Sequence, residues 1–264
     1  SKEEIIDIFN GKEDLKGKII RCVGDPEKRF SEDALRILRA YRFSSVLNFD
    51  IEKNTLGASV KLGKLIENIS GERILAELKK LITGENLSPF VDFVNHGFLE
   101  FCGIGPIKKD LTQLVALEKS WELRLPIFLV LSNLDIKKLT CILKPDKSLI
   151  NSINILKEMA LLSLPVTKKD IKLLLFKYSK EHVITYFEYL KVLGVDTKTL
   201  YLNLKEIDEN SEPYLISHLA VSGEDLINLG VKGKEIGETL NRLCLYVIEN
   251  PSKNNPFDLL KFNH

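Results

Sequence analysis

The stretch SEDALRILRAYRF, Ser31 to Phe43, has the period of an amphipathic helix. On a wheel with about 3.6 residues per turn, its apolar side chains fall on one side and can face a core. That side holds Ala34, Leu35, Ile37, Leu38 and Tyr41. The spacing therefore predicts a helix over residues 32–43 that is anchored in the protein interior.

The opposite side of this predicted helix is charged. Glu32, Arg36, Arg39 and Phe43 fall within about 40° of one line, and Asp33 lies beside them. Lysine would serve a solvated face equally well, whereas arginine suits planar, bidentate hydrogen bonding. The pattern fits two interpretations, a solvated face with internal ion pairs or a binding site.

Arginine is concentrated near the start of the chain, where five of the eight arginines lie within the first 42 residues. Asp33 and Arg36 are three positions apart, so on a continuous helix they would lie side by side. Such a pair can read a nucleobase edge, because the carboxylate accepts from an exocyclic amine and the guanidinium donates to a ring nitrogen or carbonyl. Cytosine and adenine both present an exocyclic amine beside a ring-nitrogen acceptor, which matches this pair, whereas guanine and uracil present the wrong order of donor and acceptor.

The rest of the chain is helical almost everywhere, with prolines between the predicted helices. Thr167 to Asp170 and Ser222 to Asp225 have capping-box spacing, and Ser70 is another N-cap candidate. Before Ser31, residues 9–18 indicate a loop and residues 18–26 a short strand. A lone strand is unstable, so it either pairs elsewhere or belongs to a domain that begins earlier. The predicted fold is all-α, with about a dozen helices after a short β segment.

The composition is that of an ordinary globular chain. It has 264 residues, 44% of them hydrophobic and 28% charged, and a net charge of +1. No apolar run reaches the roughly 18 residues of a membrane span, and the acidic N-terminus is unlike a secretory signal. The four cysteines and four histidines are scattered, which favours reduced thiols and argues against a metal site in this chain. We expect a cytoplasmic protein without a membrane partner.

Three ordered segments resemble the bacterial class II tRNA nucleotidyltransferases (CCA-adding enzymes) and their poly(A) polymerase relatives. They are DIFNGKEDLKGKIIRCVGDPEKRFSEDALRILRAYRF with the motif E-D-x-x-R, ISGERILAELKKLI, and AVSGEDLINLGVKGKEIGETLNRLCLYVIENP. The resemblance implies an elongated array of neck, body and tail layers. It places the end of a catalytic head domain and a hinge at 1–29, the neck at 30–100, the body at 101–195 and the tail at 196–264.

The resemblance also implies roles for individual residues. Asp33 and Arg36 would pair with the base of CTP or ATP, and Glu32 would brace them. Arg39 would shape the pocket, with Arg21 on the hinge and Arg29 at the entry to the helix. Residues 70–73 would open a helix that steadies the recognition helix. Contacts to the tRNA backbone would come from the tail, through Ser222, Gly223, Lys232, Gly233 and Lys234, although Ser222, Gly223 and Gly233 also fit plain helix caps.

The catalytic part of the family is missing from this sequence. Family members carry a Gly-rich stretch and a D-x-D pair that binds Mg²⁺ in the head domain, and no such pair precedes residue 30. The chain would therefore supply base recognition and tRNA binding to an enzyme that adds CCA, CC or A to the tRNA 3′ end, and would be inactive without a head. The alternatives are a poly(A) polymerase fragment and a non-catalytic helical RNA-binding protein.

Overall fold

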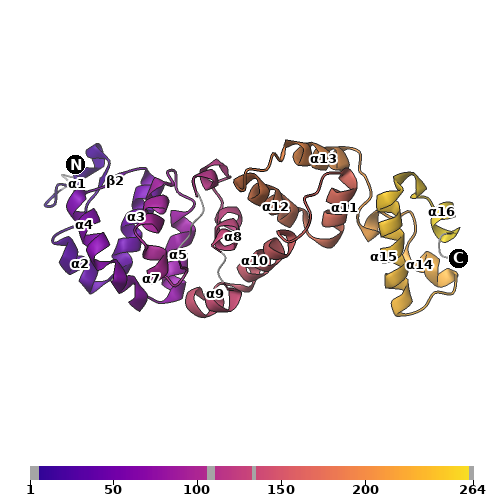
Figure 1. Cartoon of the computed structure of the whole chain (residues 1–264), viewed down its shortest axis with the longest axis horizontal. Helices are drawn as coiled ribbons and strands as arrows, with labels where there is room; N and C mark the ends of the chain where they lie inside the picture. Colours follow the sequence, from indigo (N-terminus) through magenta and orange to yellow (C-terminus); the bar gives the residue numbers. More distant parts are fainter. Residues whose placement is uncertain (1–5, 106–110, 133–134, 262–264) are drawn as a thin grey trace, which may run out of the picture. The chain divides into compact units, whose positions relative to one another are not determined.

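The computed structural model describes residues 6–105, 111–132 and 135–261, and over these residues the protein is mostly helical (Figure 1). The all-α fold class predicted from the sequence is confirmed. The chain divides into two compact units, residues 1–157 and 158–264, which are described separately below. The predicted four-part division stays a prediction.

The first unit begins with two short strands among helices. Its elements are α1 (Gly11–Gly17), β1 (Ile19–Ile20), α2 (Pro26–Glu32), α3 (Leu35–Leu47), β2 (Asp50–Ile51), α4 (Lys53–Leu62), the 3₁₀ helix η1 (Gly63–Asn68), α5 (Gly71–Leu81), α6 (Ser88–Asn95), α7 (Phe98–Phe101), η2 (Thr112–Ala116), α8 (Trp121–Leu131), α9 (Ile136–Leu143) and α10 (Lys147–Met159), whose last residues lie in the second unit.

The described residues of the second unit contain helices joined by turns and loops, and no strand. Its elements are α11 (Lys168–Lys177), α12 (Lys180–Val192), α13 (Lys198–Glu209), η3 (Ile216–His218), α14 (Gly223–Asn228), α15 (Lys234–Glu249), η4 (Pro251–Lys253) and α16 (Pro256–Lys261). None of the helices that the structure describes is long and apolar enough to cross a membrane.

The single helix predicted over residues 32–43 is wrong at its start, because two helices meet there. Asp25 caps α2 by accepting from the backbone N–H of Glu27 at 3.0 Å, and Pro26 takes the first helical position. Asp33 is extended, with φ −152° and ψ 100°. Its carboxylate accepts from the N–H of Leu35 at 3.2 Å, so it ends α2 and begins α3. A capping aspartate thus interrupts a pattern that looks continuous on a wheel.

The predicted strand finds its partner within the chain. Ile19 and Ile20 of β1 pair in parallel with Asp50 and Ile51 of β2. The segment before it, expected to be a loop, forms α1 between left-handed residues at Asn10 and Lys18. The sheet holds the residues that follow β1 against the end of α3.

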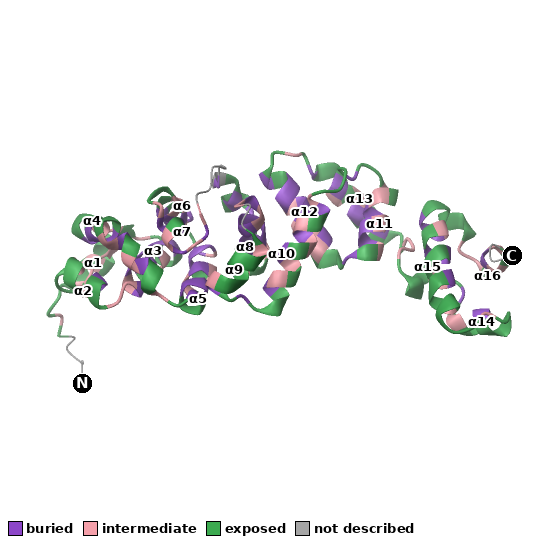
Figure 2. Ribbon diagram, turned by 60° about the horizontal axis from the view of Figure 1, so that its bottom comes forward, coloured by how far each residue is buried: buried purple, intermediate pink, exposed green. Residues whose placement is uncertain are grey.

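The core of the first unit forms around α3. As predicted, Ile37, Leu38 and Tyr41 are fully buried. The ring of Tyr41 packs edge-on against Phe93 and Phe98, with centroid distances of 5.5 and 5.4 Å. Figure 2 shows buried and exposed residues alternating along the helices, as expected for amphipathic segments. The charged side of α3 is thereby left at the surface.

A buried arginine fixes α8 to α5. Arg124 is 2% exposed and donates to the carbonyls of Ile82 at 2.9 Å and Leu117 at 2.6 Å. Burial lowers the pKa of its guanidinium. The same helix continues through Pro126, although proline was expected to separate helices at this point. These contacts tie the C-terminal end of α5 to the neighbouring loop.

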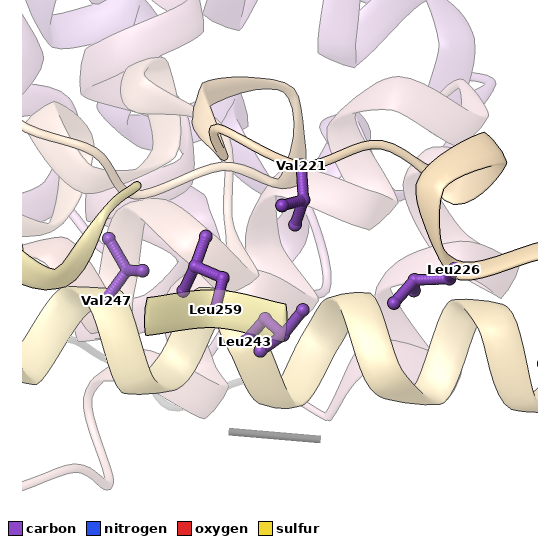
Figure 3. Close-up of a cluster of buried hydrophobic side chains, with 5 residues drawn as sticks. All are labelled: Val221, Leu226, Leu243, Val247 and Leu259. Atoms are coloured by element: carbon purple, nitrogen blue, oxygen red, sulfur yellow. The ribbon is translucent and has the colours of Figure 1, made fainter. Parts of the chain in front are cut away.

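A separate apolar cluster joins the last helices of the second unit (Figure 3). It consists of Val221, Leu226 on α14, Leu243 and Val247 on α15, and Leu259 on α16. Both predicted capping boxes are present: Thr167 with Asp170 begins α11, and Ser222 with Asp225 begins α14. Because the cluster packs α14 against α15, it fixes the position of the loop that joins these two helices.

Candidate functional site

Four arginines surround one open pocket of about 260 Å³ in the first unit. Residues after β1, on α2, on α3 and on α4 form its walls. The lining includes Arg21, Arg29, Arg36, Arg39, Phe43, Cys22, Ala40 and Thr55. Four of the six residues predicted to bind a nucleotide therefore meet here, although they come from three different segments.

Glu32 lies behind two of these arginines. Its Oε2 accepts from Arg29 Nη1 at 2.7 Å and from Arg36 Nη1 at 2.9 Å. The hydrogen bond from Arg36 is the main reason why the pKa of the Glu32 carboxyl is lowered. Arg36 Nη1 also donates to the carbonyl of Arg29 at 2.8 Å. Glu32 holds Arg29 and Arg36 together but does not itself line the pocket.

Arg21 is held by acids on two neighbouring elements. Its Nε donates to both carboxylate oxygens of Asp14, at 3.0 and 3.1 Å, and this contact raises the pKa of the guanidinium. Glu52 Oε1 lies 3.9 Å from Arg21 Nη1. Glu52 in turn caps α4 by accepting from the N–H groups of Asn54 and Thr55 at 3.0 and 2.9 Å. These contacts fix Arg21 at the mouth of the pocket.

Arg39 is the exception among the four arginines. It is exposed on α3 and lines the pocket, yet it has no ion-pair or hydrogen-bond partner among residues 6–105, 111–132 and 135–261. Arg21 is bonded to Asp14 and lies near Glu52, whereas Arg29 and Arg36 share the single carboxylate of Glu32. The arginine pocket therefore carries an excess of positive charge, to which Arg39 contributes in full, and this suits an anionic ligand.

Asp33 is placed differently from the sequence prediction. It does not line the pocket, and in the described part of the chain its carboxylate makes no hydrogen bond to Arg36. Instead, Arg73 Nη2 on α5 lies 3.3 and 3.4 Å from its two oxygens. The side-by-side pair inferred from the wheel is thus absent from the described residues, because the helix breaks between α2 and α3. Asp33 stays about one-third exposed, so a ligand can still reach its carboxylate.

The start of α5 packs closely on its neighbours. A Cβ on Gly71 would lie 1.7 Å from the carbonyl oxygen of Ile142, so only glycine allows α9 to approach this closely. Glu72 pairs with Lys144 at 2.9 Å. One turn after Arg73, Glu77 pairs with Arg42 of α3. Helix α5 therefore contacts the charged segment Ser31–Phe43 at Asp33 and again at Arg42.

A second pocket of about 470 Å³ adjoins the arginine pocket. The two share Phe43 and residues 20–23, but the second is mostly apolar. Several of its lining side chains are well exposed, including Phe9 at 60%, Leu15 at 65% and Leu47 at 46%. Sequence reasoning missed this pocket, since its residues are spread from Phe9 to Phe49 without a local motif.

The residues predicted to bind tRNA lie around α14 and α15 in the second unit. Ser222 is engaged by its own cap, because Asp225 Oδ2 accepts from the Ser222 N–H at 2.7 Å and from Oγ at 2.8 Å. Gly223 follows as the first residue of α14. By contrast, Gly233 at the start of α15 has no side-chain cap and adopts φ 57° with ψ −129°, which glycine tolerates. Lys232 and Lys234 flank it and are exposed.

No group of three or more His, Cys, Asp or Glu side chains that could hold a metal ion occurs among the described residues. The acids around the arginine pocket are each bonded to an arginine or to a helix start. Their arrangement fits an anion-binding pocket rather than a metal centre, so the Mg²⁺ implied by the family resemblance does not fit the residues present.

Sequence reasoning missed Glu52, Thr55 and Arg73 as neighbours of the site. Glu52 and Thr55 gave only the signal of a helix start. Arg73 was identified at the opening of α5, but its partner Asp33 lies 40 residues away, so the sequence alone could not connect them. Phe43 did carry a signal, since it shares the wheel line of Arg36 and Arg39.

Comparison with known proteins gives consistent matches. A protein-family model described as "Probable RNA and SrmB- binding site of polymerase A" matches residues 48–102. The CCA-adding enzyme of Pediococcus pentosaceus is 33% identical over 271 residues, covering 97% of this chain and 66% of that protein. The CCA-adding enzyme of Staphylococcus haemolyticus is also 33% identical, covering 98% of this chain and 67% of that protein. The chain therefore spans about two thirds of these relatives.

Solved structures match over the same part. The crystal structure of the Bacillus stearothermophilus CCA-adding enzyme in complex with CTP has a TM-score of 0.76 at 26% identity, covering 98% of this chain and 69% of that one. The Thermotoga maritima CCA-adding enzyme complexed with tRNA_CCA gives 0.68 at 20% identity, with 97% and 66% covered. At this lower identity the second match supports the fold alone.

Proposed function

Since this chain belongs to the family of CCA-adding enzymes, we propose that it supplies nucleotide recognition and tRNA binding to a tRNA nucleotidyltransferase. The observation that carries the proposal is the pocket of four arginines, in which Arg29 and Arg36 share one carboxylate and Arg39 is paired with none of those that the structure describes. Such a pocket suits a nucleoside triphosphate, which brings a base edge and several negative charges together.

Within this proposal, Arg36 donates to the edge of cytosine or adenine, and Asp33 accepts from the exocyclic amine. Glu32 keeps the Arg36 guanidinium in place from behind, at 2.9 Å. Asp33 must leave its long contacts with Arg73, which at 3.3 and 3.4 Å are weak and solvent-exposed. Arg39, Arg29 and Arg21 face the phosphates. When the nucleotide binds, its exocyclic amine thus replaces Arg73 as the partner of Asp33.

The role of Arg39 is tested by nuclear magnetic resonance titration of this chain. Arg39→Gln is expected to weaken binding of CTP and ATP about tenfold, because a charge-assisted hydrogen bond contributes about 1.5–3 kcal/mol and solvent screening reduces that at an exposed site. Cytidine, which lacks phosphates, should bind equally to both proteins. Lys64→Gln is the matched control, since Lys64 is an exposed cation that does not line the pocket. Unchanged CTP affinity in Arg39→Gln would contradict the proposal.

We further propose that a head domain covers the apolar pocket and brings the catalytic Mg²⁺. Exposed apolar side chains in the first 23 residues support this, with Ile6 at 85%, Ile8 at 78% and Val23 at 52%. Exposed apolar surface of this kind marks a site of contact with another domain or chain. The head would come from the third of the relatives that this chain does not match, or from a separate chain, and would activate the tRNA 3′-hydroxyl in the cytoplasm.

The tRNA backbone is proposed to bind at the start of α15. Lys232, Gly233 and Lys234 present two cations and a helix N-terminus without a side-chain cap, while Ser222 and Gly223 begin the preceding helix α14. The alternative is that Ser222 and Gly223 only cap α14 and do not contact RNA. The hydrogen bonds from the N–H and Oγ of Ser222 to Asp225 favour this alternative, because they already engage both groups.

Replacing both Lys232 and Lys234 by Ala is expected to lower tRNA affinity roughly tenfold. The slope of log affinity against log salt should become shallower by about 1 to 2, because each phosphate contact releases about one counterion. Salt-dependent binding to this chain measures both quantities. The matched control replaces Lys198 and Lys205 by Ala, which removes the same charge from another helix of the second unit, α13. Equal salt slopes for the two double variants would contradict the assignment.

A second candidate function is that of a poly(A) polymerase portion. The family model that matches residues 48–102 supports it, because its description refers to polymerase A. The two candidates differ in substrate. A head-bearing form should extend tRNA that lacks its CCA end if the first proposal holds, and unrelated RNA 3′ ends if the second does.

A further inference from the structure

We infer that Phe43 is the ring on which the nucleobase stacks in the arginine pocket, and that Glu77 is a positioning residue that holds this ring through Arg42. The inference rests on the proposed nucleotide-binding function and names a residue that the charge pattern alone does not identify. Its starting point is that Phe43 lines both adjoining pockets and so forms the wall between them.

Phe43 is the accessible aromatic side chain of the arginine pocket. The other ring among the lining residues, Phe30, is 1% exposed and belongs to the core, whereas Phe43 is half-buried. Phe43 follows Arg39 by one helical turn and Arg36 by two, so all three lie on the same side of α3. A base held at its edge by Arg36 would therefore lie beside this ring.

The ring is held from one side. The guanidinium carbon of Arg42 lies 3.8 Å from the centroid of Phe43, which is a cation–π contact. This arrangement covers one face of the ring, so the other face and the edges are what the ring offers to the pockets. A stacking surface needs this fixed orientation, because a mobile ring would have to be ordered when the ligand binds.

Arg42 in turn is held from α5. Its Nε lies 2.5 Å from Glu77 Oε2, and the two side chains are only 14% and 13% exposed. The contact is an ion pair without the angles of a hydrogen bond. A partly buried cation without its carboxylate would turn toward water. Removing the charge of Glu77 should therefore release Arg42 from Phe43 and leave the ring free to rotate.

Stacking on an aromatic ring tolerates any base, since every base has a π face. Phe43 is therefore expected to supply affinity common to CTP and ATP, while the edge contacts supply the choice between bases. A binding assay can therefore distinguish the role of Phe43, which affects overall affinity, from the roles of Asp33 and Arg36, which affect the choice of base. Loss of the ring should weaken all nucleotides by a similar factor.

The test places 4-fluorophenylalanine at position 43 of this chain and follows its ¹⁹F resonance during titration with CTP and with ATP. A base stacked on the ring should shift the resonance in a saturable way, and the same probe at Phe49, which lines only the apolar pocket, should not shift. Phe43→Leu should weaken CTP and ATP binding about tenfold or more. Phe49→Leu, the matched control, should leave both affinities unchanged.

Glu77→Gln should change the ¹⁹F resonance of the free chain and weaken both nucleotides several-fold. Glu72→Gln, which removes a surface ion pair one turn earlier on α5, should do neither. A purely structural role of Glu77 would lower the melting temperature without moving the resonance. If Phe43→Leu does not fold, the ¹⁹F titration of the chain that carries 4-fluorophenylalanine at position 43 still tests the stacking role. Saturable nucleotide binding that leaves the Phe43 signal in place would overturn the stacking role, whereas a chain that binds neither CTP nor ATP would overturn the proposed function itself.

Discussion

Asp33→Ala is expected to reduce the preference of the head-bearing enzyme for CTP and ATP over UTP and GTP by roughly ten- to a hundredfold. The exocyclic amine of the correct base would lose its acceptor in a partly desolvated pocket, at a cost of about 1–3 kcal/mol. Steady-state rates with all four nucleotides measure the preference. Arg36→Lys should also be damaging, because an ammonium group cannot reproduce the planar fork of donors.

The structure shows that Asp33→Ala changes more than base reading. Asp33 also begins α3 through the N–H of Leu35, so its loss removes a cap worth about 1 kcal/mol. Asp33→Asn separates the two effects, since asparagine caps equally well and its amide can offer a donor to uracil or guanine. This variant should keep its melting temperature while its preference shifts toward UTP and GTP.

Arg73→Gln is the matched control for the ion pair of Asp33. It removes the partner on α5 but leaves the carboxylate in place. If Asp33 reads the base, this variant should retain the preference for CTP and ATP. If Asp33 is only a helix-end ion pair, Arg73→Gln and Asp33→Asn, which keeps the cap, should lower stability alike and leave selectivity intact. An unchanged preference in Asp33→Ala would overturn the assignment of this residue.

The chain of residues 1–264 alone is expected to add no nucleotide to tRNA in the presence of Mg²⁺, CTP and ATP. Attack of a 3′-hydroxyl on an α-phosphate needs metal ions to activate the oxygen and to neutralise developing charge. The sequence contains no Asp-x-Asp pair that would hold two such ions. Because enzymes accelerate their reactions by at least about a millionfold, transfer without the metal-binding head should fall below detection.

Incorporation of radiolabelled ATP into tRNA that lacks its last nucleotides is the measurement. Joining the chain to the head domain of a relative is the positive control, and transfer should then appear. A preparation of the chain alone that transfers nucleotide robustly would mean that its own carboxylates bind the catalytic ions. The binding experiments on Arg39 and Phe43 do not depend on this result, since they require no chemistry.

The sequence by itself determined the helical class, the buried side of α3 and the two capping boxes. These are properties of neighbouring residues: an apolar period of 3.6, or a Ser or Thr three positions before an Asp. It also determined that arginines gather near one end of the chain. The structure buries Leu35, Ile37, Leu38 and Tyr41, as their period along one side of the helix predicted.

Only the tertiary structure decided how the charged residues pair. The wheel assumed one helix, but the extended Asp33 ends α2 and begins α3, so Glu32 and Asp33 point to different partners. Glu32 bonds Arg29 and Arg36, while Asp33 faces Arg73 on α5. Ion pairs and pocket walls join residues that are distant in the chain, and their geometry depends on how helices pack. A local pattern cannot specify that packing, which is why the arginines were found from the sequence and, apart from Glu32, their partners were not.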